Sequence, residues 1–127
     1  MSDAWTDDAT MLQHLGDDDH ILGAVVPPIF QNSLFVFKTL DEFEHMATLP
    51  PGKHAYSRIT NPTVRILEQK VAALERSEEA RIFSSGMAAI SSAVMSCVKT
   101  GDHIVCVETA YGPLKKFLAY LEKFDIT

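Results

Sequence analysis

Two serines and a glycine stand at the start of an apolar, helix-like stretch in the segment FSSGMAAISS, which begins at Phe83. If Ser85 is the helix N-cap, Gly86 and Met87 are the first helical residues, and their N–H groups have no partner within the helix. The helix dipole adds a partial positive charge at this end. Glycine has no Cβ, so an anion can approach the backbone at Gly86. The pattern indicates a phosphate site; the alternative is a plain serine cap on a core helix.

Three further side chains have types that suit a ligand with a phosphate and an aromatic ring. The segment YSRITNPT holds Tyr56 and Arg58 just before a predicted helix start. A guanidinium makes forked contacts with phosphate. The segment ETAYG places Tyr111 directly after a predicted strand, where its ring can stack on a flat ligand. The alternatives are a surface ion pair for Arg58 and a rim position for Tyr111.

Residues 61–127 carry the regular elements that would position these groups. Apolar residues at helical spacing predict helices in NPTVRILEQKVAALER, GMAAISSAVMSCVK and GPLKKFLAYLEKF, the first with Asn61 as N-cap and Pro62 at the first helical position. The short apolar runs ARIF and HIVCVE predict two strands, buried on both faces in a parallel sheet. The order helix–strand–helix–strand–helix predicts an α/β fold.

Residues 1–60 lack this regularity. They contain the interrupted apolar stretch AVVPPIFQNSLFVF and a second pair of prolines at 50–51. The stretch TLDEFEHMATL predicts one short helix. Such a composition predicts an extended arm that packs on another surface. The sequence therefore divides into an arm, residues 1–60, and a regular part, residues 61–127.

The composition excludes several classes of protein. The chain has 127 residues, of which 46% are hydrophobic and 22% charged, and its net charge is −6. These values are typical of a soluble globular chain, and the acidic balance argues against nucleic-acid binding. No stretch resembles a membrane span or a signal peptide. Cys97 and Cys106 form no metal or redox motif, so we expect a reduced cytoplasmic protein without a metal site.

Several segments together resemble a known family. Taken in order, GAVVPPIFQNSLF, YSRITNPT, RIFSSGMAAI, GDHIV and AYG resemble the N-terminal part of the Cys/Met metabolism family of pyridoxal-phosphate enzymes. This family includes cystathionine γ-synthases, cystathionine lyases and methionine γ-lyases. The resemblance implies part of a fold type I, aminotransferase-like domain and a homotetramer built from tight dimers. It also implies a sulfur-containing or O-activated amino-acid substrate.

The resemblance implies a role for each candidate residue. The backbone at Gly86 and Met87 would bind the phosphate of pyridoxal phosphate, and Tyr111 matches the tyrosine that stacks on the pyridine ring. Tyr56 and Arg58 match the pair that reaches the cofactor phosphate of the neighbouring subunit. Residues 1–60 would then be an arm laid on that subunit, and pyridoxal phosphate is the implied cofactor.

A catalytic lysine is not evident. Pyridoxal-phosphate chemistry requires a lysine that forms a Schiff base with the cofactor. In the family this lysine has an S-x-T-K type setting, well beyond the part that this sequence resembles. None of the seven lysines has that setting: Lys38, Lys53, Lys70, Lys99, Lys115, Lys116 and Lys123. We therefore expect an N-terminal fragment that holds a phosphate and ring site without a catalytic residue and is inactive alone.

Two alternatives stay open beside the enzyme fragment. The chain could be a non-catalytic binding or dimerising module, or a nonfunctional truncated remnant. Among the family's reactions, the sequence does not distinguish γ-synthase, γ-lyase, β-lyase and sulfhydrylase. Pro113 stands where methionine γ-lyases usually have a cysteine, which argues against that member.

Overall fold

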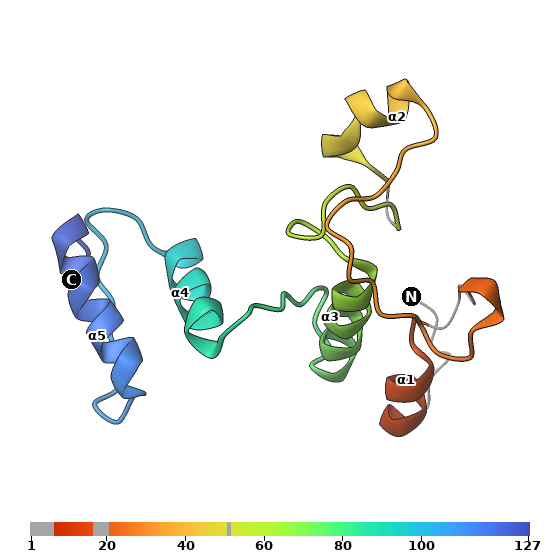
Figure 1. Ribbon diagram of the computed structural model, residues 1–127. Helices are drawn as coiled ribbons and strands as arrows, with labels where there is room; N and C mark the ends of the chain where they lie inside the picture. Colours follow the sequence, from red (N-terminus) through yellow and green to blue (C-terminus); the bar gives the residue numbers. More distant parts are fainter. Residues whose placement is uncertain (1–6, 17–20, 51) are drawn as a thin grey trace. The chain divides into compact units, whose positions relative to one another are not determined.

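A computed structural model describes residues 7–16, 21–50 and 52–127 (Figure 1). The chain forms two compact units. The N-terminal unit spans Met1–Ala80 and the C-terminal unit spans Arg81–Thr127. The predicted arm, residues 1–60, lies within the N-terminal unit, although its residues 1–6, 17–20 and 51 fall outside the described ranges.

Helix α3, Pro62–Leu74, is the longest element of the N-terminal unit. It begins as predicted, with Asn61 as N-cap and Pro62 in the first turn. Pro suits this position because its missing N–H would have no helical partner there. Helix α1, Asp8–His14, packs against α3 and buries Met11. The predicted apolar stripe of α3 is not covered, since Leu67 remains 48% exposed.

The rest of the N-terminal unit is made of short elements. A 3-10 turn covers Ile21–Gly23, helix α2 covers Leu40–Glu44, and a second 3-10 turn covers Met46–Thr48. The last two confirm the short helix predicted in TLDEFEHMATL. Thr39 caps α2, because its side chain accepts a hydrogen bond from the backbone N–H of Glu42.

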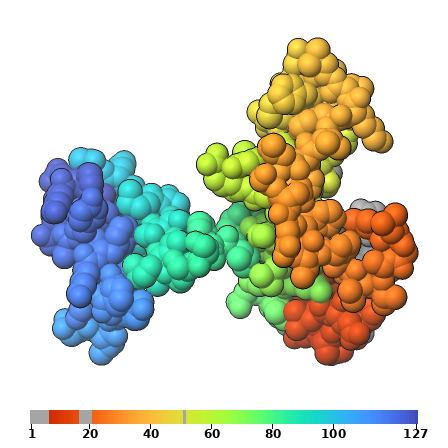
Figure 2. All heavy atoms as spheres, in the orientation of Figure 1, coloured from red at the N-terminus to blue at the C-terminus, as the bar shows by residue number. Residues whose placement is uncertain are grey.

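The extended stretch 25–36 lies on the surface of the N-terminal unit (orange in Figure 2). It meets residues 55–57 through an isolated antiparallel bridge between Leu34 and Tyr56. Most of its apolar side chains are exposed, including Val25, Val26, Ile29, Leu34 and Val36. Much of the apolar surface of this segment is therefore left uncovered by the described residues.

Helices α4, Gly86–Cys97, and α5, Gly112–Leu121, form the C-terminal unit, and a 3-10 turn, Glu122–Phe124, follows α5. The two helices pack together and run in the same direction, both beginning at the lower end of the unit in Figure 1. Leu121 and Ile126 are almost fully buried, at 2% and 4% exposure. All three helices predicted after residue 60 are thus confirmed.

The two predicted strands are not formed. Residues 80–83 and 103–108 have no strand assignment, and the described residues contain no strand beyond the isolated bridge. The expected burial is also wrong here, since Val105 is 88% and Val107 70% exposed. A strand exists only through backbone pairing with a neighbour. In the second segment, within the described part of the chain, backbone pairing with another segment reaches only the first residues.

That pairing involves the last residues of the chain. The N–H of Thr127 donates to the carbonyl of Asp102 at 3.1 Å, and the N–H of Ile104 donates to the carbonyl of Thr127 at 2.6 Å. Thr127 thus bonds to the residues before and after His103, which is the hydrogen-bond pattern of two parallel strands. The last residues of the chain, 125–127, therefore lie beside the start of the second predicted strand.

No described helix has the length and apolar character needed to cross a membrane. Separately, no group of three or more His, Cys, Asp or Glu side chains arranged to hold a metal ion occurs in the described ranges. Cys97 and Cys106 are both free and exposed.

Candidate functional site

The start of α4 has the geometry of an anion site. Ser85 is the N-cap, as predicted, with extended backbone angles, and its hydroxyl accepts a hydrogen bond from the N–H of Ala88 at 3.1 Å. Among the described residues, none accepts from the N–H groups of Gly86 and Met87. A Cβ added at Gly86 would meet nothing within 4 Å. The helix start therefore offers two backbone donors beside open space, a donor set that fits a phosphate.

Tyr111 lies at the start of the other helix of the C-terminal unit. It occupies the N-cap position of α5, is 63% exposed, and makes no side-chain capping bond. Since α4 and α5 begin at the same end of this unit (Figure 1), Gly86, Met87 and Tyr111 gather at one end of it.

Tyr56 and Arg58 lie together in the N-terminal unit. The guanidinium carbon of Arg58 is 4.9 Å from the centroid of the Tyr56 ring, a cation–π contact. Tyr56 is half-buried and Arg58 is exposed. No described carboxylate pairs with Arg58, so its charge is not neutralised within the described part of the chain.

A buried amide holds the backbone around this pair. Asn61 is 7% exposed, and its side chain bonds Thr63, Ser57 and Phe30. The sequence predicted Asn61 only as a helix cap. The contact with Phe30 joins residues 31 apart in the sequence, so it was not visible in any local pattern.

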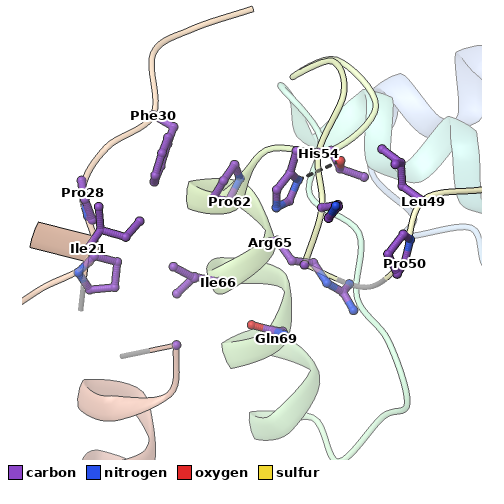
Figure 3. Close-up of a pocket in the computed structure, with 15 residues that line it drawn as sticks. Ile21, Pro28, Phe30, Leu49, Pro50, His54, Pro62, Arg65, Ile66 and Gln69 are labelled. Carbon is purple, nitrogen blue, oxygen red and sulfur yellow. Dashed lines mark hydrogen bonds between the residues drawn. The ribbon is translucent and has the colours of Figure 1, made fainter. Parts of the chain in front are cut away.

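A separate cavity of about 580 Å³ lies within the N-terminal unit (Figure 3). Among the residues that line it are Ile21, Pro28, Phe30, Leu49, Pro50, His54, Pro62, Arg65, Ile66 and Gln69. None of the five predicted cofactor residues lines it. The cavity is therefore distinct from the predicted phosphate and ring site.

Two of the ionisable groups that line this cavity are already engaged by other side chains. Arg65 makes a forked ion pair with Glu79, at 2.6 and 2.8 Å, and this pairing holds the pKa of Arg65 above its usual range. His54 shares a hydrogen bond with Thr60 at 2.9 Å, and its ring lies 5.4 Å from that of Phe35. Burial lowers the pKa of His54 below 6.5. Both groups thus have structural partners.

Comparison with known proteins establishes the family. The model of the family described as "Cys/Met metabolism PLP-dependent enzyme" matches residues 9–127. The chain belongs to this family. Pyridoxal phosphate is therefore the cofactor of the family to which the chain belongs, as the sequence resemblance implied.

Members of the Cys/Met metabolism family that catalyse different reactions have similar sequence identity to this chain. The chain is 40% identical over 99 residues to an L-methionine gamma-lyase of Fusobacterium nucleatum subsp. polymorphum, covering 78% of this chain and 25% of that protein. It is 41% identical over 100 residues to an O-succinylhomoserine sulfhydrylase of Pseudomonas aeruginosa, covering 77% of this chain and 25% of that protein. The chain spans about a quarter of the length of the curated relatives it matches.

Solved structures of the Cys/Met metabolism family are similar in fold to this chain. A putative O-acetylhomoserine (thiol)-lyase from Campylobacter jejuni matches with a TM-score of 0.84 and 27% identity, over 94% of this chain and 30% of that one. Its structure contains N'-pyridoxyl-lysine-5'-monophosphate. The structural neighbours are pyridoxal-phosphate enzymes of fold type I. The predicted fold family is thus confirmed. The two predicted strands are not formed in the described residues.

Proposed function

We propose that this chain is the part of a transsulfuration-type lyase or synthase that binds the phosphate and the ring of pyridoxal phosphate. The observation that carries the proposal is the start of α4, where Gly86 and Met87 present unpartnered N–H groups beside open space. This site lies within the family match. The dipole of α4 favours an anion at the same point.

Tyr111 supplies the ring contact in this proposal. Its exposed phenol lies at the same end of the C-terminal unit as the α4 start. An aromatic ring stacks favourably on a flat heteroaromatic ligand. When bound, pyridoxal phosphate supplies the electron sink that weakens bonds at the α-carbon of an amino acid. The residues of this chain hold and orient that group, and no lysine with the S-x-T-K setting stands beside them.

Tyr56 and Arg58 act toward a neighbouring subunit in the proposed assembly, a dimer of dimers. Their cation and phenol are presented together, and the unpaired charge on Arg58 suits a phosphate. The exposed apolar stretch 25–36 supports a role for residues 1–60 as an arm on that subunit. Residues 61–127 would then begin the cofactor-binding domain.

The proposed substrate is a sulfur-containing or O-activated amino acid. The relatives include both L-methionine gamma-lyases and sulfhydrylases at nearly equal identity, so identity does not choose between these reactions. Pro113, in place of the cysteine usual in methionine γ-lyases, favours a reaction other than methionine γ-elimination.

A second candidate function is a non-catalytic module that associates with full-length family members. It rests on the exposed apolar side chains of the arm and on the lysines, none of which has the family setting. Copurification of a tagged chain with a coexpressed full-length relative tests it. Association lost on replacing Val36 with Glu would support the module, and no association would exclude it.

Two variants at one position test the main proposal. Gly86→Pro removes a backbone N–H at the first helical residue, a position that tolerates proline, and Ser85 already has the extended ψ of 155° that proline requires before it. Gly86→Ala adds a Cβ but keeps the N–H. We expect Gly86→Pro to weaken binding of pyridoxine phosphate about tenfold more than Gly86→Ala does, as one lost bond to a charged group would. Affinities in both variants equal to that of the unaltered chain would exclude the α4 start as the phosphate site.

A further inference from the structure

Asn61 is a buried polar residue whose side-chain amide bonds to three segments of the chain. Its Oδ1 accepts from the N–H of Thr63 at 2.9 Å. Its Nδ2 donates to the carbonyl of Phe30 at 3.0 Å and to the hydroxyl of Ser57 at 2.9 Å. A neutral amide has two donor hydrogens and an acceptor oxygen with two lone pairs, and here both donors and one lone pair are used. The residue is 7% exposed, so water cannot readily replace these partners.

Ser57 is the link from this amide to the proposed phosphate contact. Its N–H donates to the carbonyl of Ser33 at 2.9 Å, and its hydroxyl donates to the carbonyl of Asn32. With the bond from Asn61, Ser57 is fixed through both its backbone and its side chain. Ser57 is also the residue between Tyr56 and Arg58 in the sequence. Fixing its position therefore limits the directions in which both neighbouring side chains can leave the backbone.

Thr63 closes the same network from the helix side. Its hydroxyl accepts from the N–H of Phe30 at 2.9 Å and donates to the carbonyl of Pro28 at 3.4 Å. The first turn of α3 is thus bonded to residues 28–30, and residues 32–33 are bonded to Ser57. The tyrosine and arginine are presented from a short turn that Asn61 joins to both the helix and the arm.

We propose that Asn61 is a positioning residue that holds Tyr56 and Arg58 in the geometry that binds the cofactor phosphate. The inference rests on the proposed function of that pair. It adds that the amide donors of Asn61, rather than its capping oxygen, are what phosphate binding requires. A helix cap needs only an acceptor, which Asp and Ser provide about as well as Asn. Neither a carboxylate nor the shorter hydroxyl of serine reproduces the two donations to Phe30 and Ser57.

Two variants separate the donor role from the cap. Asn61→Ser keeps a capping oxygen and leaves both acceptors without their amide donor. Asn61→Asp keeps the cap and places a charge against the Phe30 carbonyl, so it is the more disruptive of the two. Thr39→Ala is the matched control, because it deletes the N-cap of α2, which lies outside the network. Circular dichroism and thermal unfolding first establish that each variant is folded.

Two measurements are then made on each folded variant. The first is amide hydrogen exchange at Ser57, which reports local opening of the turn. The second is the dissociation constant for pyridoxine phosphate, with and without the additional change Arg58→Ala. We expect Asn61→Ser to speed exchange at Ser57 and to weaken binding about tenfold, as loss of one well-placed charged contact would. In the Arg58→Ala background the same change should have little further effect, because Asn61 acts through Arg58.

The outcomes distinguish this inference from the proposed function. Unchanged affinity in Asn61→Ser, or an equal loss in Thr39→Ala, would overturn the positioning role. A full effect of Asn61→Ser in the Arg58→Ala background would also overturn it, since the residue would then not act through the arginine. If the unaltered chain itself does not bind pyridoxine phosphate, the proposed function fails. Exchange at Ser57 then shows independently whether Asn61 holds the turn.

Discussion

The guanidinium of Arg58 lies over the ring of Tyr56, with 4.9 Å between the guanidinium carbon and the ring centroid. The two side chains are two positions apart in the sequence and flank Ser57, whose backbone N–H and hydroxyl are both bonded to residues 32–33. A cation and a phenol are therefore offered together from a fixed turn, and no described carboxylate competes for the cation.

Arg58→Ala should weaken binding of the phosphorylated cofactor and leave the fold intact. Loss of one charge-assisted phosphate contact costs on the order of 1.5–3 kcal/mol, or roughly 10- to 150-fold in affinity. Equilibrium titration with pyridoxine phosphate measures it. Arg76→Ala is the control, because it removes the same charge and side chain from another exposed position. An equal loss of affinity in both variants would show that the effect comes from the change in net charge and not from a contact made by Arg58.

No single lysine of this chain should react selectively with pyridoxal phosphate. The seven lysines lack the S-x-T-K setting, so Schiff bases should form slowly and be distributed among them. Borohydride reduction followed by peptide mass spectrometry checks this. One dominant modified lysine, lost in Gly86→Pro, would contradict the prediction and would mean that the chain holds its own catalytic lysine.

The purified chain should self-associate or bind a hydrophobic dye. Val105 and Val107 are 88% and 70% exposed in a segment with few backbone partners, and the arm exposes further apolar side chains. Unpaired extended backbone and apolar surface both promote association. Light scattering with dye fluorescence tests this. A monodisperse monomer with strongly protected amides at residues 103–107 would mean that the chain covers these segments itself.

The stability of the N-terminal unit should fall as the pH drops below 6.5. Burial lowers the pKa of His54 from 6.5 in the folded chain, so the unfolded chain binds the proton more readily. Protonation therefore favours unfolding, and the contribution of His54 is fully present above pH 6.5 and lost as the pH falls through its folded pKa. Urea unfolding at several pH values should show this slope, and His54→Gln should flatten it. An identical slope in both proteins would assign it to other groups.

The helices could be predicted from the sequence because their signals are local. Asn61 with Pro62 marks the start of α3, and Ser85 marks the start of α4. In the C-terminal unit the apolar stripe of α5 also ends at Leu121, the most buried residue of that unit. Caps and stripes act within a few residues, so neighbouring sequence contains them.

Strand formation, and the hydrogen bonds that hold the turn at Tyr56 and Arg58, depend instead on residues far away in the sequence. HIVCVE has the composition of a buried strand, but its backbone pairs only at its start, where the N–H of Ile104 donates to the carbonyl of Thr127. Its composition does not show which chain segment would cover Val105. Likewise, the cap at Asn61 was visible in N-P-T, whereas its bond to Phe30 joins positions 31 apart. Such bonds are set by the tertiary arrangement and have no local pattern.

The central claim is that this chain recognises the phosphate of its cofactor through backbone donors and Arg58. The most direct measurement compares the dissociation constants of pyridoxine phosphate and pyridoxine, which share the ring and lack the aldehyde that reacts with lysines. We predict that the phosphate improves affinity at least about tenfold, and that inorganic phosphate competes with the phosphorylated ligand. Equal affinity for the two ligands, or binding of neither, would contradict the account.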